Sequence, residues 1–205
     1  MRLVGLYSSS SGHGKDTVAR LLLNNTMTIP DSYRLVWREI LNGQRLHILD
    51  YSLWEIKKFA TAPKKIVADM YNVPITKLED RDWRLQPQPP FSKPPLHLVI
   101  DIAQKMKEII NEDVWKDVLF NQYTDTDRWV ISDVRFPCEY EEIKKRGGIM
   151  IKIERPGCQA PRQVMDGLLD AYEFDERLIN EDGKWIQMVT DLHVIIKKYK
   201  LNAAA

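Results

Sequence analysis

A loop of small side chains around a single lysine is the part of this sequence best suited to chemistry. Residues 9–17 read Ser-Ser-Ser-Gly-His-Gly-Lys-Asp-Thr and directly follow the apolar run 3–7. A strand, such a loop and a helix would turn backbone N–H groups and a helix N-terminus toward an anion. Lys15 would then reach the β- and γ-phosphates of a nucleoside triphosphate. The sequence therefore predicts that the phosphates of ATP are bound by Ser11, Gly12, His13, Gly14, Lys15, Asp16 and Thr17.

This loop differs from the P-loop pattern G-x-x-x-x-G-K-[ST] at two positions. Ser9 stands where the pattern has its first glycine. Asp16 stands where the pattern has the hydroxyl that binds Mg²⁺, and Thr17 follows one residue later. Because a carboxylate repels phosphates unless Mg²⁺ or a lysine screens it, we interpret Asp16 as part of the metal shell or as an anchor for the loop. The alternative for the whole segment is a Ser/Gly-rich turn before an ordinary helix.

The elements that would position this loop alternate between strands and helices, which predicts a parallel α/β sheet. Apolar patterns predict strands at 3–7, 128–132 and 149–153, and more weakly at 33–37 and 45–49 around the turn signal Asn42-Gly43. They predict helices at 18–23, 54–71, 96–111, 113–122, 139–146 and after Gly183. Pro63 lies inside the helix expected at 54–71, where it marks either a kink or the true start of that helix.

Charged side chains follow two of the expected strands, where ligands of open parallel sheets bind. Asp133 and Arg135 follow the strand at 128–132, and Arg155 and Arg162 follow the next one. Phosphoryl transfer depends mainly on positioning and on cations that stabilise spread negative charge. We assign Asp133 to ordering Mg²⁺, Arg135 to clamping the acceptor phosphate, and the other two arginines to a lid that excludes water. A turn cap at Asp133 and surface roles for the lid arginines are the alternatives.

The composition indicates a soluble globular protein of one domain, or of one domain with a lid. The chain has 205 residues, of which 44% are apolar and 29% charged, and a formal net charge of +1 gives no basic field for nucleic acid. It has no apolar run of membrane-spanning length and no signal peptide before the first expected strand. Cys138 and Cys158 are the only cysteines, which favours a reducing cytoplasm. The four histidines show no spacing typical of metal ligands.

Residues 86–95 form the only segment of strongly biased composition, Gln-Pro-Gln-Pro-Pro-Phe-Ser-Lys-Pro-Pro. The prolines predict an extended, exposed segment. We interpret it as a stiff surface loop, and a polyproline ligand is the alternative. Trp83 and Trp115 lie on either side of it in the sequence, and each belongs by default to a core, with ligand stacking as the alternative.

Several motifs occur in a characteristic order along nearly the whole chain, from about Met1 to His193. The specific ones are Gly12-His13-Gly14-Lys15-Asp16-Thr17 and Ile131-Ser132-Asp133-Val134-Arg135-Phe136-Pro137 with Glu139. The weaker ones are at 54–60, 73–74, 78–81 and 178–183. In these motifs the chain resembles bacteriophage deoxynucleoside monophosphate kinases.

The resemblance implies an α/β fold with a parallel sheet, the adenylate-kinase-like P-loop kinase fold. It implies one domain with its core at 1–30 and 126–200, a helical acceptor-binding insertion at about 31–125 and a lid at about 155–168. The implied reaction is transfer of the γ-phosphoryl group of ATP to a deoxynucleoside 5′-monophosphate with Mg²⁺, for dNTP supply. The location would be the cytoplasm, of a host if the chain is phage-encoded. Nucleotides would be the partners, without nucleic acid or membrane, and a homodimer is one option because related kinases commonly pair.

The resemblance also assigns residues by position. Catalytic roles fall to Lys15, Asp16, Asp133 and Arg135, and Mg²⁺ would be held among Asp16, Thr17 and Asp133. The acceptor would be bound by Phe59, Arg81, Trp83, Lys93, Trp115 and Arg135, and the lid would supply Arg155 and Arg162.

Two segments depart from that family. Residues 92–99 lack its arginine and glutamine, so Lys93 is assigned the role of the missing cation, and 163–167 lack its lid motif. The accepted base and the choice between deoxyribose and ribose therefore stay open. Two other functions also stay open. They are a P-loop kinase of another small phosphate ester, similar to animal phosphomevalonate kinases, and a non-catalytic ATP-binding protein.

Overall fold

The computed structural model describes residues 2–23, 54–158 and 166–201, and the chain divides into two compact units. The sheet unit consists of Met1–Lys57 and Thr124–Ala205, and the helical unit consists of Lys58–Tyr123. The helical unit lies within the insertion expected at about 31–125. The strands expected at 33–37 and 45–49, and the lid residue Arg162, lie outside the described residues.

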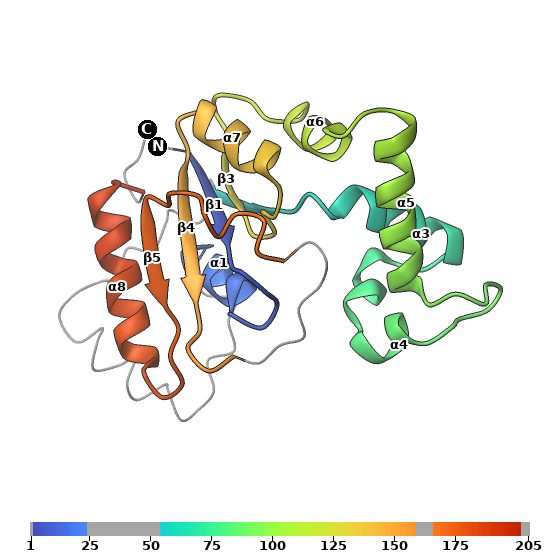
Figure 1. The fold of residues 1–205 in the computed structure, drawn as a ribbon, viewed down its shortest axis with the longest axis horizontal. Helices are drawn as coiled ribbons and strands as arrows, with labels where there is room; N and C mark the ends of the chain where they lie inside the picture. Colours follow the sequence, from blue (N-terminus) through green and yellow to red (C-terminus); the bar gives the residue numbers. More distant parts are fainter. Residues whose placement is uncertain (1, 24–53, 159–165, 202–205) are drawn as a thin grey trace. The chain divides into compact units, whose positions relative to one another are not determined.

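The sheet unit contains a five-stranded parallel sheet, as the alternation of strands and helices predicts (Figure 1). Its strands are β1 (Leu3–Tyr7), β2 (Trp54–Lys57), β3 (Arg128–Ile131), β4 (Ile149–Glu154) and β5 (Glu176–Ile179). Their order across the sheet is β2-β3-β1-β4-β5, and every neighbouring pair is parallel. Strand β1 is therefore central, and the loop that follows it emerges from the middle of the sheet's carboxyl edge.

Side chains alternate between the two faces of β1, as a strand requires. Val4 and Leu6 face a core that also contains buried side chains of α1 (Lys15–Leu23) and α8 (Trp185–Lys198). On the other face, a Cβ atom at Gly5 would lie 2.3 Å from Met150 Sδ and 2.9 Å from Ile143 Cδ1 of α7 (Pro137–Lys145). Gly5 thus lets α7 approach the centre of the sheet. The helices expected at 18–23, at 139–146 and after Gly183 are confirmed as parts of α1, α7 and α8.

The helix expected at 54–71 is wrong over its first residues. Residues 54–57 form β2, which pairs in parallel with β3, and the helix α3 begins at Thr61. The reason is tertiary, because Trp54 is buried in the core of the sheet unit while the helical spacing of apolar residues belongs only to the later part. Pro63 lies in the first turn of α3, where a residue needs no backbone N–H, so it marks the helix start and no kink. Strand β5 was not predicted.

The helical unit consists of α3 (Thr61–Tyr71), the short helix η1 (Ile75–Glu79), α4 (Arg81–Leu85), α5 (Pro95–Ile109) and α6 (Val114–Phe120). Helices expected at 96–111 and 113–122 are confirmed as α5 and α6. Val67, Ala68, Leu78 and Val99 form a small core. Residues 86–94 connect α4 to α5 without regular structure and are mostly exposed, as their prolines predict. No helix within the described ranges is long and apolar enough to cross a membrane.

Candidate functional site

The loop between β1 and α1 has a backbone that only glycine adopts readily at two positions. Gly12 and Gly14 have φ angles of 85° and 94°, in the left-handed region that favours glycine. A Cβ atom at Gly14 would also lie 2.5 Å from the Asn180 side-chain nitrogen, which donates to the carbonyl oxygen of His13 at 2.9 Å. The Asn180 hydrogen bond fixes the loop to the residue that follows β5, and the close approach of Asn180 leaves no room for a side chain at residue 14.

Lys15, the first residue of α1, has its side chain turned back along the loop. Its Nζ donates to Ser8 Oγ at 2.5 Å, and Ser8 Oγ donates to the carbonyl oxygen of Ser10 at 2.6 Å. Ser8 and Ser10 are both buried. The ammonium group is therefore held near the amino end of α1, where the aligned peptide dipoles already favour an anion.

Lys15 is surrounded by charged groups from its neighbour Asp16 and from two other segments of the chain. Burial lowers the pKa of Lys15 to about 8, and the Arg135 guanidinium acts in the same direction. The carboxylates of Asp16, Asp133 and Asp166 act in the opposite direction. A lysine that is partly desolvated among charges of both signs is typical of functional sites, although structural networks have the same effect.

Asp16 connects the loop to the end of strand β3. Its Oδ1 accepts a hydrogen bond from Ser132 Oγ at 3.2 Å, across 116 residues of sequence. Asp16 is otherwise exposed, and Thr17 is half-buried one residue further along α1. The contact with Ser132 is what an anchor for the loop requires, and the exposure of the carboxylate leaves it accessible to a cation.

The arginine after β3 is held by two carboxylates. The backbone N–H groups of Arg135 and Phe136 donate to Glu139 Oε2 at 2.7 and 3.0 Å, which fixes the turn into α7. Arg135 Nη1 lies 3.9 Å from Asp166 Oδ1, and the side chain of Asp166 is only 4% exposed. Asp133 lies two residues before Arg135 and is half-buried. The structure thus brings Lys15, Asp133 and Arg135 into one electrostatic neighbourhood, as their places in the sequence predict.

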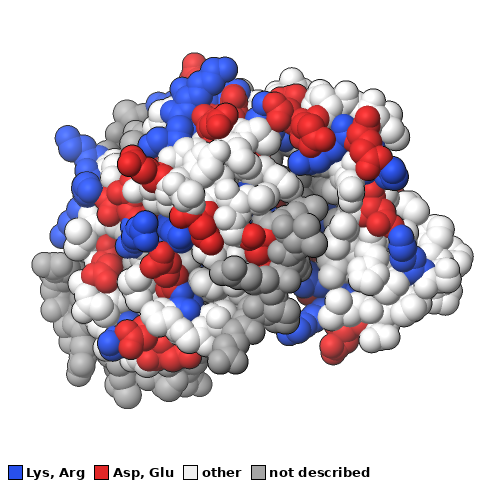
Figure 2. Space-filling view, in the orientation of Figure 1, with Lys and Arg blue, Asp and Glu red and all other residues white. Residues whose placement is uncertain are grey.

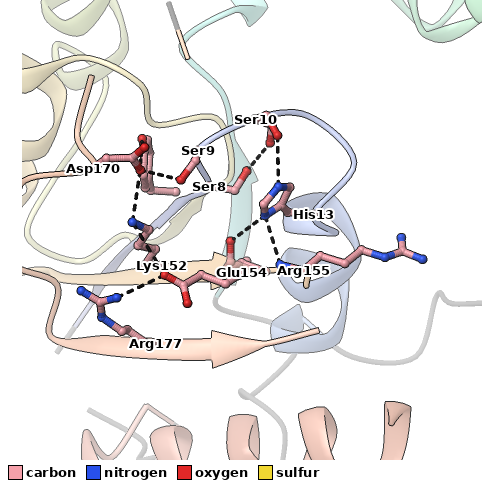
Figure 3. A network of polar contacts seen from close by, with 11 residues as sticks. Ser8, Ser9, Ser10, His13, Lys152, Glu154, Arg155, Asp170 and Arg177 are labelled. Atoms are coloured by element: carbon pink, nitrogen blue, oxygen red, sulfur yellow. Dashed lines mark hydrogen bonds and ion pairs between the residues drawn. The ribbon is translucent and has the colours of Figure 1, made fainter. Parts of the chain in front are cut away.

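His13 and Arg155 link the loop to the end of β4 (Figure 3). His13 Nε2 lies 3.0 Å from Ser10 Oγ, and its Nδ1 lies 3.2 Å from both the Ile153 carbonyl oxygen and the Arg155 backbone nitrogen. The Arg155 guanidinium donates to the Gly12 carbonyl oxygen at 3.3 Å and also to Asp182. The contacts of His13 therefore stabilise the loop, and the Arg155 guanidinium contacts the loop directly through the Gly12 carbonyl oxygen.

The residues of the helical unit that were expected to bind the acceptor differ in their burial and in their contacts. Trp115 and Phe59 are buried, and Trp115 Nε1 donates to the Ala103 carbonyl oxygen at 2.9 Å. Trp83 is half-buried, with its ring edge-on to Tyr71 at a centroid distance of 5.3 Å. Arg81 and Lys93 are exposed. The exposed Lys93 forms an ion pair with a residue of α5, Asp101.

Oxygen ligands near Lys15 fit a magnesium ion that arrives with phosphates. Mg²⁺ is commonly held by one or two carboxylates together with substrate phosphates and water. Asp16 and Asp133 supply two carboxylates within the same electrostatic neighbourhood. Across the described part of the chain, no three His, Cys, Asp or Glu side chains are grouped to hold a metal ion by themselves. These residues therefore fit Mg²⁺ shared with a nucleotide rather than a permanent metal centre.

Several residues of the site were missed from the sequence. Glu139 was noted only as part of a motif, although Pro137 followed by a glutamate is a recognisable helix start. Ser8, Asp166 and Asp170 act through contacts between segments far apart in the sequence, and no local pattern marks them. Asn180 belongs to the weak motif at 178–183, but its contact with the loop was not predicted. On the visible face of the sheet unit, positive and negative side chains are interspersed (Figure 2), so no one-sign surface points to the site.

Comparison with known proteins leaves the site to be judged on its own geometry. No protein-family model matches the sequence, and no curated protein matches it either.

Proposed function

We propose that this chain is a P-loop kinase that transfers the γ-phosphoryl group of ATP to a deoxynucleoside 5′-monophosphate. One observation carries the proposal. Lys15 lies at the start of α1, beneath a loop with two left-handed glycines, among charged side chains that come from the end of β3. A parallel sheet with this loop after its central strand is consistent with the adenylate-kinase-like fold that the resemblance implies.

In the proposed reaction an oxygen of the acceptor phosphate forms a bond to the γ-phosphorus. The bond between that phosphorus and the bridging oxygen breaks, and ADP leaves with the electron pair. Backbone N–H groups of residues 11–14 and the Lys15 ammonium hold the ATP phosphates. Arg135 holds the acceptor phosphate and neutralises charge in the transition state. Bound Mg²⁺ would further neutralise the phosphate oxygens, with Asp16, Thr17 and Asp133 available to hold it.

The helical unit supplies the proposed acceptor-recognition residues. Trp83 offers an aromatic ring that is half-buried and lies in a cluster with Tyr71 and Phe91. Such a ring suits stacking on a nucleobase, because every base presents an apolar, polarisable face. Arg81 is exposed at the first residue of α4 and suits a phosphate. The substrates are water-soluble nucleotides, and we propose the cytoplasm as the location.

A coupled assay of ADP release tests the proposal directly. ATP with Mg²⁺ is combined with each of dAMP, dCMP, dGMP and dTMP, with their ribonucleotide counterparts, and with phosphomevalonate. Turnover with at least one deoxynucleotide is expected, and it must be abolished in Lys15→Ala. Turnover with phosphomevalonate alone would reassign the acceptor, and tight ATP binding without any turnover would make the protein a non-catalytic binder.

A further inference from the structure

We infer that Asp170 is a positioning residue that sets the shape of the phosphate-binding loop through Ser9. This inference rests on the proposed function for its consequence in ATP binding, but the contact itself is independent of any reaction. Ser9 Oγ donates to Asp170 Oδ1 at 2.5 Å, across 161 residues of sequence. Ser9 stands where the P-loop pattern has glycine, so the hydroxyl that marks a departure from the pattern is the group that makes this contact.

Asp170 is fixed by partners that belong to the sheet (Figure 3). The same oxygen, Oδ1, accepts from Tyr7 Oη at 3.1 Å on β1 and from Lys152 Nζ at 3.1 Å on β4. The Asp170 backbone N–H also donates to the Gly167 carbonyl oxygen at 3.0 Å, which closes a tight turn. Ser9 is therefore the only one of the three side-chain donors to this oxygen that lies in the loop, and the other two hold the carboxylate in place.

The charges around Asp170 keep it ionised. Burial would raise the pKa of Asp170, but hydrogen bonds from Ser9, Lys152 and Tyr7 lower it below its usual range. Lys152 is only 8% exposed and lies 3.7 Å from Glu154, which in turn pairs with Arg177 at 3.2 Å. A hydrogen bond to an ionised acceptor is stronger than one between neutral groups. The Ser9 hydroxyl therefore donates to an ionised acceptor, whose side chain is 37% exposed.

Ser9 is connected to Lys15 by one peptide link and one hydrogen bond. Ser9 is covalently next to Ser8, and Ser8 Oγ is the acceptor for Lys15 Nζ. If Ser9 were released, the Ser8 hydroxyl and the backbone N–H groups that follow it would lose a fixed position. We therefore expect Asp170 to influence ATP affinity while leaving affinity for the acceptor unchanged.

Two matched hydroxyl deletions test this route. Ser9→Ala and Tyr7→Phe each remove one hydroxyl donor from the same carboxylate oxygen, but only Ser9 belongs to the loop. By isothermal titration with ATP and Mg²⁺, we expect Ser9→Ala to raise the Kd about tenfold, or ~1.4 kcal/mol, because the loop loses its hydrogen bond to the Asp170 carboxylate. The KM for the acceptor should stay unchanged in Ser9→Ala. Tyr7→Phe should change the ATP affinity less than Ser9→Ala, because Lys152 still holds the carboxylate in that variant. Ser9→Thr, which keeps the hydroxyl, should restore the affinity.

Amide hydrogen exchange of residues 9–14 without nucleotide separates this inference from the proposed function. Exchange should be faster in Ser9→Ala, and Tyr7→Phe should have a smaller effect because Lys152 still holds the carboxylate. If the wild type binds no ATP, the proposed function fails, and the exchange rates still decide whether Asp170 positions the loop. The inference would be overturned if Ser9→Ala had the same exchange rates and the same ATP affinity as the wild type. It would also be overturned if Ser9→Ala and Tyr7→Phe changed these quantities equally. Asp170→Asn should have the same effect on the loop. If that variant does not fold because Lys152 loses its ion pair with Asp170, the Ser9→Ala variant alone decides.

Discussion

The candidate binding residues of the sheet unit and of the helical unit differ in the sequence separation of their contacts. In the sheet unit, contacts between distant parts of the sequence gather the candidates: Asp16 with Ser132, and the Asn180 side chain with the His13 carbonyl. In the helical unit, the candidates make nearby contacts. Trp115 donates to Ala103, and Lys93 pairs with Asp101.

The difference follows from what each unit can build. A parallel sheet brings the carboxyl ends of all its strands to one edge, so residues far apart in sequence converge without further requirements. Short helices around a small core have no such edge, and their large side chains are needed for packing. The proposed phosphate site is therefore organised by the fold of the sheet unit, whereas the proposed recognition of the acceptor depends on which aromatic side chains the helical core leaves accessible.

The strongest test of the comparison is loss of Lys15 from the sheet unit. Lys15→Ala should lower kcat/KM about a thousandfold, or ~4 kcal/mol of transition-state stabilisation, because it removes the only lysine held against the loop by Ser8. Circular dichroism and thermal unfolding should show an intact fold. Lys145→Ala, an exposed lysine near the end of α7, is the control and should be fully active. Full activity in Lys15→Ala would remove the basis for a phosphate site.

In the helical unit, the two tryptophans should respond differently. Trp115→Ala should lower the free energy of unfolding by about 3 kcal/mol, because it removes a buried ring together with the hydrogen bond from the indole to the Ala103 carbonyl oxygen. Trp83→Ala should cost less stability and should raise the KM for the acceptor. Urea unfolding and steady-state kinetics on both variants measure this contrast. Equal losses of stability, with no change in KM for Trp83→Ala, would assign both rings to the core.

The third test asks whether Arg135 of the sheet unit also takes part in binding the acceptor. Arg135→Ala should raise the acceptor KM by about thirtyfold, or ~2 kcal/mol, with little change in ATP affinity. Asp166→Asn should give a smaller change in the same direction, because it releases the Arg135 guanidinium without removing it. Kinetics with each substrate varied in turn distinguish the two sides. A collapse of ATP affinity in Arg135→Ala would move this arginine to the donor side.

Much of the fold follows from local sequence, and the exceptions have a common cause. The strands 3–7, 128–131 and 149–154 are apolar runs that would be buried in any parallel sheet, and α5 begins at Pro95, one residue before the helix expected at 96–111. The edge strands β2 and β5 are short and have less uniform burial. Their strand conformation depends on pairing with β3 and β4, which the sequence does not display locally.

The residues of the candidate site also fall into those that local sequence predicts and those that depend on tertiary contacts. Gly14, Lys15 and Arg135 are recognisable because backbone conformation and strand ends leave a local pattern. Asp166 and Asp170 are not, because a carboxylate in a turn acquires a role only when the sheet places a lysine, a tyrosine or an arginine beside it. Trp115 is buried, which favours its interpretation as a core residue, and burial is a property of the folded chain that no local pattern shows.

The smallest effect expected is a pH dependence that belongs to the sheet unit alone. Burial, followed by the nearby Arg135, lowers the pKa of Lys15 to about 8, from an ordinary value of 10.5. Between these two values the unfolded chain binds more protons, so the Lys15 contribution makes the free protein more stable as pH rises through this window. ATP binding has the opposite dependence, because the phosphates favour the charged lysine and binding above pH 8 must take up a proton.

We therefore expect the Kd for ATP with Mg²⁺ to rise about tenfold between pH 7.5 and 9.5. Titration calorimetry in two buffers of different ionisation enthalpy would detect the proton uptake at the higher pH. Lys15→Arg keeps its charge throughout this range and should lose the dependence, even if it binds more weakly. The acceptor KM should stay flat over the same range, because Lys15 is assigned to the ATP phosphates and not to the acceptor. The same slope in Lys15→Arg would mean that another group carries the proton, and Lys15 would then not be the cation that meets the phosphates.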